Sequence, residues 1–284
     1  MKKNGFFMLC MMAFAVLAMA QPEKEGWKLV WNDEFDADGR PDALKWDYER
    51  GYVRNYEEQW YAPENAFLRD GKLVIEARQA DFPCPAYREG NSNWRNSRKR
   101  VQWTSASLIT RNKFSFLYGR VEVRARIPVC MGAWPAIWLL GMEHPWPANG
   151  EIDMLEYYQH KGLPTILANA CWAGDTEDDT QWDSSYTPLT HFTERDPAWA
   201  GRFHVWRMDW DSDFIRLYLD DELLNEVDLK RTINGKIRGT GINPFHYPQY
   251  LLLNLALDTR VKKFNLADFP MKYEVDYVRV YQKK

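Results

Sequence analysis

The sequence predicts an all-β fold, in the form of a jelly-roll sandwich of two antiparallel sheets. From Trp27 onward, most segments alternate polar and apolar residues, or run apolar, over about four to eight residues between turn signals. Long amphipathic helical patterns with capping residues are nearly absent. The sequence contains no fixed-period repeat of the kind that indicates a propeller or a solenoid. We therefore expect many short strands and few helices.

The predicted strands follow one another along most of the chain. They are Lys72–Arg78, Ser105–Thr110, Gly119–Ile127, Phe203–Trp210, Phe214–Leu219, Tyr250–Leu257 and Tyr273–Tyr281. Hairpin turns are expected at Asp70-Gly71, before the first of these strands, and at Asp220-Asp221, after the fifth. Residues 81–100 and 173–200 are rich in charged and turn-forming residues, so we expect both to be long surface loops.

The first twenty residues have the form of a secretory signal. Two lysines precede a continuous apolar run over residues 5–16, and small residues allow cleavage after Ala20. This run is too short to span a membrane, which takes about 20 apolar residues, and no later segment approaches that length. We expect residues 1–20 to be removed and residues 21–284 to form a single domain. The protein is then secreted to the periplasm, the cell surface or the medium.

Charge and cysteine content exclude several kinds of partner. Removal of the two signal lysines changes the net charge from −3 to −5, and a mildly acidic protein is a poor nucleic-acid binder. Cys84, Cys130 and Cys171 remain, an odd number without Cys-x-x-Cys spacing. That pattern disfavours a disulfide framework or a structural zinc site. One pair of these cysteines could still form in an oxidising compartment.

The strongest chemical signal is a run of three acidic residues, Glu151, Asp153 and Glu156, within an apolar and strand-like segment. In a regular strand, Glu151 and Asp153 share one face and Glu156 points to the other. A one-residue bulge at Met154-Leu155 would bring all three carboxyls to one face.

Two glutamates on such a face could act as the carboxyl pair of a retaining glycosidase, which lies about 5–5.5 Å apart. One carboxylate attacks the anomeric carbon, and the other donates a proton to the leaving oxygen. Asp153 between them could hydrogen-bond the nucleophile, and the nearby like charges would keep one group protonated. The alternatives are an exposed acidic strand face and a calcium site.

The segment Glu-Ile-Asp-Met-Leu-Glu resembles the catalytic motif of glycoside hydrolase family 16, in the longer, bulged form of laminarinases and related galactan hydrolases. Other blocks resemble the family in the same order along the chain. They are Trp31–Phe35, Asn65 with Asp70–Leu73, Tyr118–Arg120, Ala133–Trp138, Phe203–Trp206 and Val275–Tyr281. The resemblance implies a jelly roll with a concave substrate cleft. It also implies Glu151 as nucleophile, Asp153 as its assisting carboxylate and Glu156 as general acid/base.

The resemblance further implies substrate contacts at seven positions of these blocks and of the segment that precedes the acidic run. They are Asn65, Arg120, Trp134, Trp138, Trp146, His204 and Trp206. The 14 Trp and 15 Tyr suit this interpretation, because the C–H face of a sugar stacks on an aromatic ring. Structural alternatives remain for individual positions: core packing for the tryptophans, an ion pair for Arg120 and a hydrogen-bonded core histidine for His204.

Many family members also hold a structural calcium on the convex face. By motif position, the resemblance implies Asp276 as a ligand, with Glu34 and Gly71 as its partners. Calcium prefers several oxygen ligands, so an ion pair between Asp276 and Arg279 is the alternative. No cofactor is expected for catalysis.

The expected substrate is a neutral β-glucan. Residues 55–59, Asn65 and the approach through Trp146 resemble the laminarinase and mixed-linkage glucanase branch, which implies an endo-hydrolase of β-1,3 or mixed β-1,3/1,4-glucan acting as a monomer. One departure affects the cleft edge, because residues 257–260 read Leu-Asp-Thr-Arg where laminarinases commonly have a glycine pair. The alternatives are an endo-hydrolase of algal galactans, agarase or porphyranase, and a non-catalytic polysaccharide-binding jelly roll.

Overall fold

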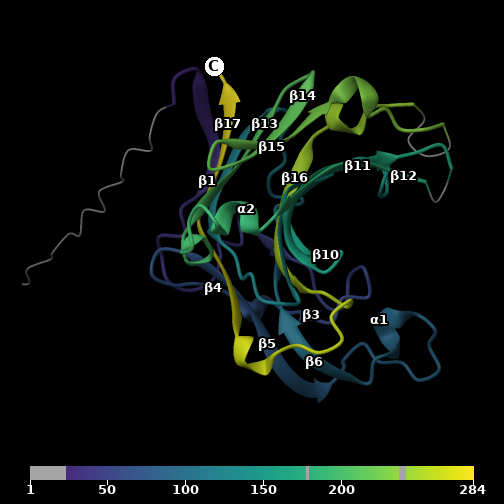
Figure 1. Cartoon of the computed structure of the whole chain (residues 1–284). Helices are drawn as coiled ribbons and strands as arrows, with labels where there is room; N and C mark the ends of the chain where they lie inside the picture. Colours follow the sequence, from purple (N-terminus) through teal and green to yellow (C-terminus); the bar gives the residue numbers. More distant parts are fainter. Residues whose placement is uncertain (1–23, 177–178, 237–240) are drawn as a thin grey trace, which may run out of the picture.

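The computed structural model describes residues 24–176, 179–236 and 241–284. Its strands form two sheets, one of ten strands and one of seven, which pack against each other over a shared hydrophobic core (Figure 1). The structure confirms the predicted all-β sandwich, because helices are confined to a few short turns in the described residues. The predicted signal segment lies outside the described residues.

The larger sheet contains ten strands. They are β1 (Trp27–Asp33), β3 (Trp60–Tyr61), β4 (Ala66–Leu68), β5 (Leu73–Pro83), β6 (Arg100–Ser105), β8 (Gly119–Arg126), β13 (His204–Trp210), β14 (Phe214–Leu219), β15 (Glu222–Asp228) and β17 (Met271–Lys283). Their order is β15-β14-β13-β8-β17-β5-β6-β3, with β1 paired to β17 and β4 to β5. Only the contact between β3 and β6 is parallel among the described strand pairs of this sheet.

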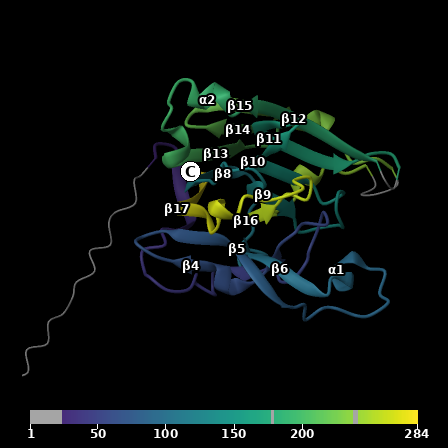
Figure 2. The same cartoon turned by 60° about the horizontal axis from the view of Figure 1, so that its bottom comes forward.

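The smaller sheet carries the acidic run. Its strands are β2 (Asp47–Tyr48), β7 (Ser107–Ile109), β9 (Ala133–Gly141), β10 (Glu151–His160), β11 (Leu163–Ala173), β12 (Thr180–Pro188) and β16 (Gln249–Leu257). They follow in the order β12-β11-β10-β9-β16-β7-β2, and Figure 2 shows β11, β10, β9 and β16 side by side. Two short helices, α1 (Trp94–Ser97) and α2 (Thr190–Thr193), lie in the connections. Five 3-10 turns complete the described elements: Pro63–Asn65, Trp199–Gly201, Leu229–Arg231, Pro244–His246 and Leu266–Asp268.

Each predicted strand has a counterpart in the structure, and both predicted hairpins are confirmed. At Asp70-Gly71 the two φ angles are 51° and 68°, and the backbones of Arg69 and Lys72 exchange hydrogen bonds of 2.9 and 3.2 Å. Asp220 and Asp221, with φ of 46° and 68°, join β14 to β15 in the same way. Left-handed φ at both central residues matches the twist of the flanking strands, which is why this turn type closes hairpins.

The segment 173–200 differs from the prediction, because it contains β12 as well as loop. β12 reads Thr-Gln-Trp-Asp-Ser-Ser-Tyr-Thr-Pro and pairs with β11 along its whole length. It is the edge strand of its sheet, and none of its residues is fully buried. An edge strand that keeps both faces partly in solvent can be polar, so its sequence resembles that of a loop. In the other segment, 81–100, the predicted loop contains only α1 and the ends of β5 and β6.

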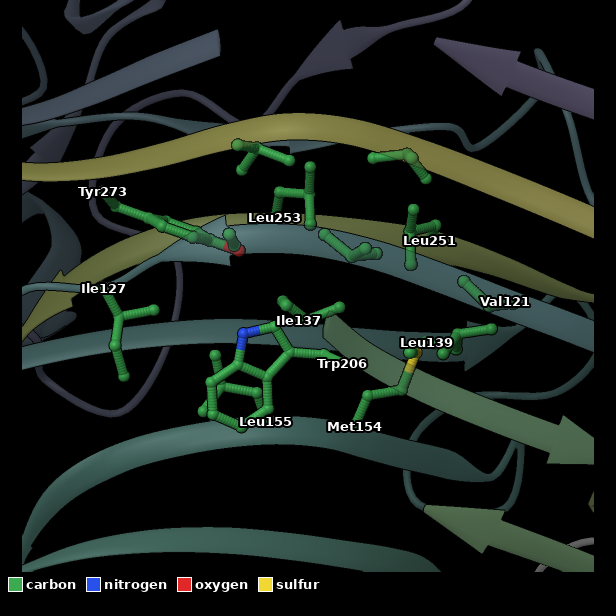
Figure 3. Close-up of a cluster of buried hydrophobic side chains, with 14 of the residues drawn as sticks. Val121, Ile127, Ile137, Leu139, Met154, Leu155, Trp206, Leu251, Leu253 and Tyr273 are labelled. Carbon is green, nitrogen blue, oxygen red and sulfur yellow. The ribbon is translucent and has the colours of Figure 1, made fainter. Parts of the chain in front are cut away.

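The core lies between the two sheets. Every second residue of the central strands points into it, as Ile137 and Leu139 do on β9 and Leu251 and Leu253 do on β16 (Figure 3). Burial of about 25 cal/mol per Å² of apolar surface makes this layer the main source of stability. The alternation leaves the opposite residues of the smaller sheet on its outer face, where they are available for a site.

Strand β10 departs from regular alternation at the predicted bulge. Its pairing register shifts after Asp153 against both neighbours, β9 and β11. Met154 and Leu155 are consecutive, yet both are fully buried in the core. Because two neighbours share the inner face, Glu156 turns to the outer face together with Glu151 and Asp153. The predicted bulge is therefore confirmed.

Three cysteines lie among the described residues. Cys84, Cys130 and Cys171 are all free thiols there. No helix in the described part of the chain is both long and apolar enough to cross a membrane.

Candidate active site

A cleft of about 610 Å³ lies on the outer face of the smaller sheet. Strands β9, β10, β11, β12 and β16 supply its floor through residues that point away from the core. The residues before β3 and after β16 supply parts of its rim. The lining includes Arg54, Asn55, Glu57, Trp134, Ala136, Trp138, Leu140, Trp146, Glu151, Asp153, Glu156, Tyr158, Leu167, Asn169, Trp182, Ser184, Tyr186, Asn254, Ala256 and Arg260.

All three predicted carboxyls point into this cleft. Gly150, with a φ of 75°, ends the turn that leads into β10, and Glu151 is the first residue of the strand. A side chain at Gly150 would contact Pro244 at 2.9 Å, so the glycine permits both the left-handed backbone and the close packing. The bulge then places Glu156 on the same face. The three carboxyl groups therefore form one cluster on the outer face of the sheet.

Each glutamate accepts a hydrogen bond from an indole N–H. Trp146 Nε1 donates to Glu151 Oε2 at 2.8 Å, and Trp134 Nε1 donates to Glu156 Oε1 at 2.9 Å. Asn169 on β11 donates to Glu156 Oε2 at 3.0 Å and, more weakly, to Asp153 Oδ2 at 3.4 Å. These donors fix the rotamers of the two glutamates and hold them at separate positions in the cleft.

Burial raises the pKa of every carboxyl in the cluster. It raises the pKa of Glu151 to about 7, with a further contribution from the charge of Glu156, while the Trp146 hydrogen bond and Arg54 oppose the rise. The pKa of Asp153 is raised well above its usual range by burial and then by the two glutamate charges. Burial also raises the pKa of Glu156, against the hydrogen bond from Trp134 and the charge of Arg260.

The protons in this cluster are divided unequally. A hydrogen bond between Asp153 and Glu151 raises the pKa of Asp153 and lowers that of Glu151. Asp153 therefore keeps the shared proton and donates a hydrogen bond to Glu151. This hydrogen bond favours the ionised form of Glu151. Near neutral pH the cluster contains both protonated and ionised carboxyls. That is the combination needed for general acid catalysis beside a nucleophile.

Three of the predicted substrate-binding tryptophans lie in the cleft: Trp134, Trp138 and Trp146. Trp138 is 7% exposed, and its Nε1 donates to Asn254 Oδ1 at 2.7 Å, so it forms part of the floor. Trp146 is 48% exposed at the rim, where its ring is accessible to a ligand.

The prediction that Asn65 and Arg120 line the cleft is wrong. Asn65 is 1% exposed, and its side chain donates to the Glu76 carbonyl at 2.7 Å and to Thr104 at 3.0 Å. Arg120 lies on β8 of the other sheet, where it forms a two-pronged ion pair with Asp209 at 2.5 and 2.8 Å. Both residues contact strands of the ten-stranded sheet and lie outside the cleft lining.

His204 and Trp206 also lie on the other sheet, on β13, and their predicted place in the cleft is wrong. His204 Nδ1 lies 2.5 Å from Asp220 Oδ2, and its ring stacks on Trp199 with centroids 4.2 Å apart. Trp206 is fully buried in the core between the sheets (Figure 3). The structural alternatives, a hydrogen-bonded histidine and a core tryptophan, describe them correctly.

The two carboxylates expected to hold calcium, Glu34 and Asp276, are each paired with an arginine in this structure. Glu34 forms a two-pronged ion pair with Arg279 at 3.0 and 2.7 Å, and Asp276 pairs with Arg124 at 2.6 Å. Gly71 belongs to the hairpin between β4 and β5. Carboxylates that neutralise a guanidinium fit a cation poorly, and the described residues contain no group of three or more His, Cys, Asp or Glu arranged for a metal.

Several cleft residues were missed by the sequence reasoning. Asn169, Trp182 and Tyr186 reach the cleft through strands β11 and β12, and Arg54 and Arg260 reach it from connecting segments. In the sequence, the alternation of Trp182 and Tyr186 with Ser184 was the available signal for a strand face. The contact between Asn169 and the acidic run depends on the register of β10 with β11, which no local pattern reveals.

A carboxyl pair of this kind, on one face of a β-sandwich and beside exposed aromatic rings, defines the class of glycoside hydrolases. The sequence profile of Glycosyl hydrolases family 16 matches residues 55–251. The chain therefore belongs to this family.

Individual relatives agree with this assignment. The chain is 33% identical to a β-glucanase of Rhodothermus marinus over 300 residues, covering 99% of this chain and 95% of the relative. The crystal structure of the laminarinase from Rhodothermus marinus matches with a TM-score of 0.71 and 33% identity, over 91% of this chain and 98% of that chain. A structure from work on endo-acting O-glycanases, with which human gut bacteria initiate mucin breakdown, matches with a TM-score of 0.81 and 36% identity. It covers 93% of this chain and 94% of that chain.

Proposed function

We propose that the protein is an endo-acting, retaining hydrolase of β-1,3-glucan or mixed-linkage β-1,3/1,4-glucan. The observation that carries this proposal is the pair of half-buried glutamates, Glu151 and Glu156, each of which accepts a hydrogen bond from an indole N–H in one cleft. The β-glucanase and the laminarinase of Rhodothermus marinus support the choice of a glucan.

In the first half of the proposed reaction, the Glu151 carboxylate attacks the anomeric carbon. The glycosidic C–O bond breaks, and Glu156 donates its proton to the leaving oxygen. Glu151 is then joined to the sugar by an ester bond, and Glu156 is ionised. Asp153 keeps its proton and donates a hydrogen bond to Glu151, which orients the attacking oxygen.

In the second half, Glu156 accepts a proton from a water molecule as the water oxygen attacks the same carbon. The bond to Glu151 breaks, and the original protonation states return. The two displacements give net retention of the anomeric configuration. This scheme needs only carboxyl groups and water, so we propose that no cofactor takes part in catalysis.

A neutral substrate suits the charges of the cleft. Among the described lining residues the only cations are Arg54 and Arg260, and each has a carboxylate partner, Glu49 and Asp258. Recognition of a polyanion would require several uncommitted basic groups. The basic residues of segment 81–100 are absent from the described lining, so the structure does not favour a sulfated galactan.

A mucin-type O-glycan is a second candidate substrate. The specific observation is the TM-score of 0.81 with the structure from work on O-glycanases, which exceeds the 0.71 of the laminarinase. The same two carboxyls would serve both substrates, because the chemistry concerns only the anomeric carbon and the leaving oxygen.

The release of reducing ends from a panel of polysaccharides tests the proposal. The panel contains laminarin, barley mixed-linkage glucan, agarose, porphyran and mucin O-glycans. We expect release from the glucans by the wild type, none by Glu151→Gln, and wild-type release by Glu64→Gln, which changes an exposed glutamate outside the cleft lining. Release from O-glycans alone would transfer the assignment to the second candidate. Silence on the whole panel would favour a non-catalytic binding protein.

We also propose that the protein is exported, because residues 1–20 have the composition of a signal peptide. The test is the N-terminal sequence of the protein recovered outside the cytoplasm. A start at Gln21 is expected, and a start at Met1 would contradict export through this segment.

A further inference from the structure

The segment that follows β16 forms part of the cleft rim next to Glu156. Asp258 in this segment is 1% exposed, and its backbone N–H donates to the Gly132 carbonyl at 3.0 Å. The Asp258 side chain accepts hydrogen bonds from the backbone N–H of Arg260 at 2.9 Å and from its Nε at 2.7 Å. This is also where the sequence departs from the glycine pair that is common in laminarinases. A compact turn therefore fixes Arg260 at this rim.

The guanidinium of Arg260 lies over aromatic rings of the catalytic sheet. Its central carbon is 4.1 Å from the ring centroid of Tyr158 and 5.3 Å from that of Trp134. Trp134 is the residue whose N–H holds Glu156. The Arg260 side chain is nevertheless 52% exposed and lines the cleft. The guanidinium is thus fixed in place and accessible to a ligand. Trp134 contacts both this guanidinium and the proposed acid/base, Glu156.

The other cleft arginine has a different environment. Arg54 is paired with Glu49, has a side chain only 22% exposed, and packs on the ring of Trp138 with its central carbon 4.8 Å from the centroid. It is committed to the floor of the cleft. Of the two arginines in the described lining, Arg260 is therefore the more exposed, and it is the one that lies near Glu156.

The position of Arg260 determines which part of a substrate it would meet. Because Glu156 donates its proton to the leaving oxygen, the sugar that departs must lie beside Glu156. A guanidinium presents five N–H donors in one plane. Asp258 accepts from Nε and Tyr158 forms a further hydrogen bond with the Arg260 side chain, which leaves other N–H groups of the fork to donate to hydroxyl oxygens. Its fixed orientation reduces the entropy that such contacts cost.

We propose that Arg260 is a specificity-determining residue that binds the hydroxyl groups of the leaving-group sugar. The inference rests on the proposed function, because it requires that Glu156 is the acid/base of the glycoside hydrolase. It assigns to the turn after β16 the recognition of the sugar on the far side of the cleaved bond.

The test is calorimetric binding to variants in which no reaction takes place. The ligand is the shortest laminari-oligosaccharide or mixed-linkage gluco-oligosaccharide of three to six sugars that the wild type cleaves, because a cleaved ligand must span both sides of the bond. In the Glu151→Gln background, Arg260→Met keeps the aliphatic stem and removes the donors. We expect its Kd to rise about 10-fold or more, as for the loss of a charged hydrogen bond. Arg260→Lys should restore only part of the affinity, because an ammonium lacks the planar fork.

Arg111→Met is the matched control, since Arg111 is also an exposed arginine over a tyrosine ring, Tyr250, but does not line the cleft. Its Kd should stay at the value of the Glu151→Gln parent. An unchanged Kd for Arg260→Met would overturn the proposal. A change in the pKa of Glu156 caused by the substitution cannot affect catalysis in this test, because nothing is hydrolysed. If the wild type cleaves neither kind of oligosaccharide, the glucan assignment fails as well. A wild type that cleaves them while Arg260→Met binds normally refutes the role of Arg260 alone.

Discussion

The substitution Glu151→Gln keeps the size of a side chain that is half-buried beside two other carboxyls, and it removes an ionisable group. The raised pKa of Glu151 means that the folded protein resists losing this proton more than the unfolded chain does. The stability contributed by the neutral form is fully present below about pH 4.5, the unfolded pKa, and is lost as the pH rises through the folded value of about 7. Glutamine avoids that loss, so the variant should gain stability relative to the wild type as the pH rises.

The size of the effect follows from the pKa. A rise from 4.5 to about 7 corresponds to about 3 kcal/mol of folding free energy. The hydrogen bond that Trp146 donates to the carboxylate already lowers this pKa, so its loss is included in the figure. We expect a gain of about 3 kcal/mol near pH 8, or roughly 6–12 °C in melting temperature for a domain of this size. Near pH 4.5 the gain should nearly vanish.

Thermal unfolding followed by circular dichroism at these two pH values measures the effect. Glu64→Gln, at an exposed site, is the control and should behave as the wild type at both. Equal melting temperatures of Glu151→Gln and the wild type near pH 8 would refute the reasoning. So would a gain of the same size at both pH values, because that would arise from packing and not from a buried charge.

Other substitutions test the packing around the cleft. Trp138→Phe removes the donor to the buried oxygen of Asn254 and should cost about 1–3 kcal/mol in a urea unfolding experiment. Trp206→Ala should cost about 3–5 kcal/mol without changing the KM of the remaining folded enzyme. Trp206→Phe should cost much less, because its indole N–H has no partner in the described structure. Gly141→Ala would place a Cβ 2.0 Å from the Asn149 carbonyl oxygen. We expect a lower melting temperature and reduced turnover, because the clash displaces the turn that precedes β10.

Local sequence patterns were sufficient where a residue's role depends on its neighbours along the strand. The spacing of Glu151, Asp153 and Glu156 required a bulge to bring the acids together, and the apolar pair Met154-Leu155 supplied it. Strand periodicity likewise predicted most of the sandwich.

Patterns failed where a role depends on which sheet a strand joins. Strand β13 alternates buried and half-buried residues, as expected of a strand with one outward face, but Trp206 on it points into the core from the opposite sheet. A block of sequence shows which residues share a face, and it does not show what that face meets. The contact of Arg260 with Tyr158 joins segments that are about a hundred residues apart, so only the assembled structure reveals it.

The anomeric configuration of the first product tests the two-carboxyl mechanism most directly. Proton NMR during the hydrolysis of laminarin by the wild type resolves the α and β signals of the new reducing end before they interconvert. Double displacement through Glu151 predicts that the β anomer appears first and the α anomer follows by slow mutarotation. Initial release of the α anomer would show a single displacement with inversion, and would contradict the assignment of Glu151 as a nucleophile.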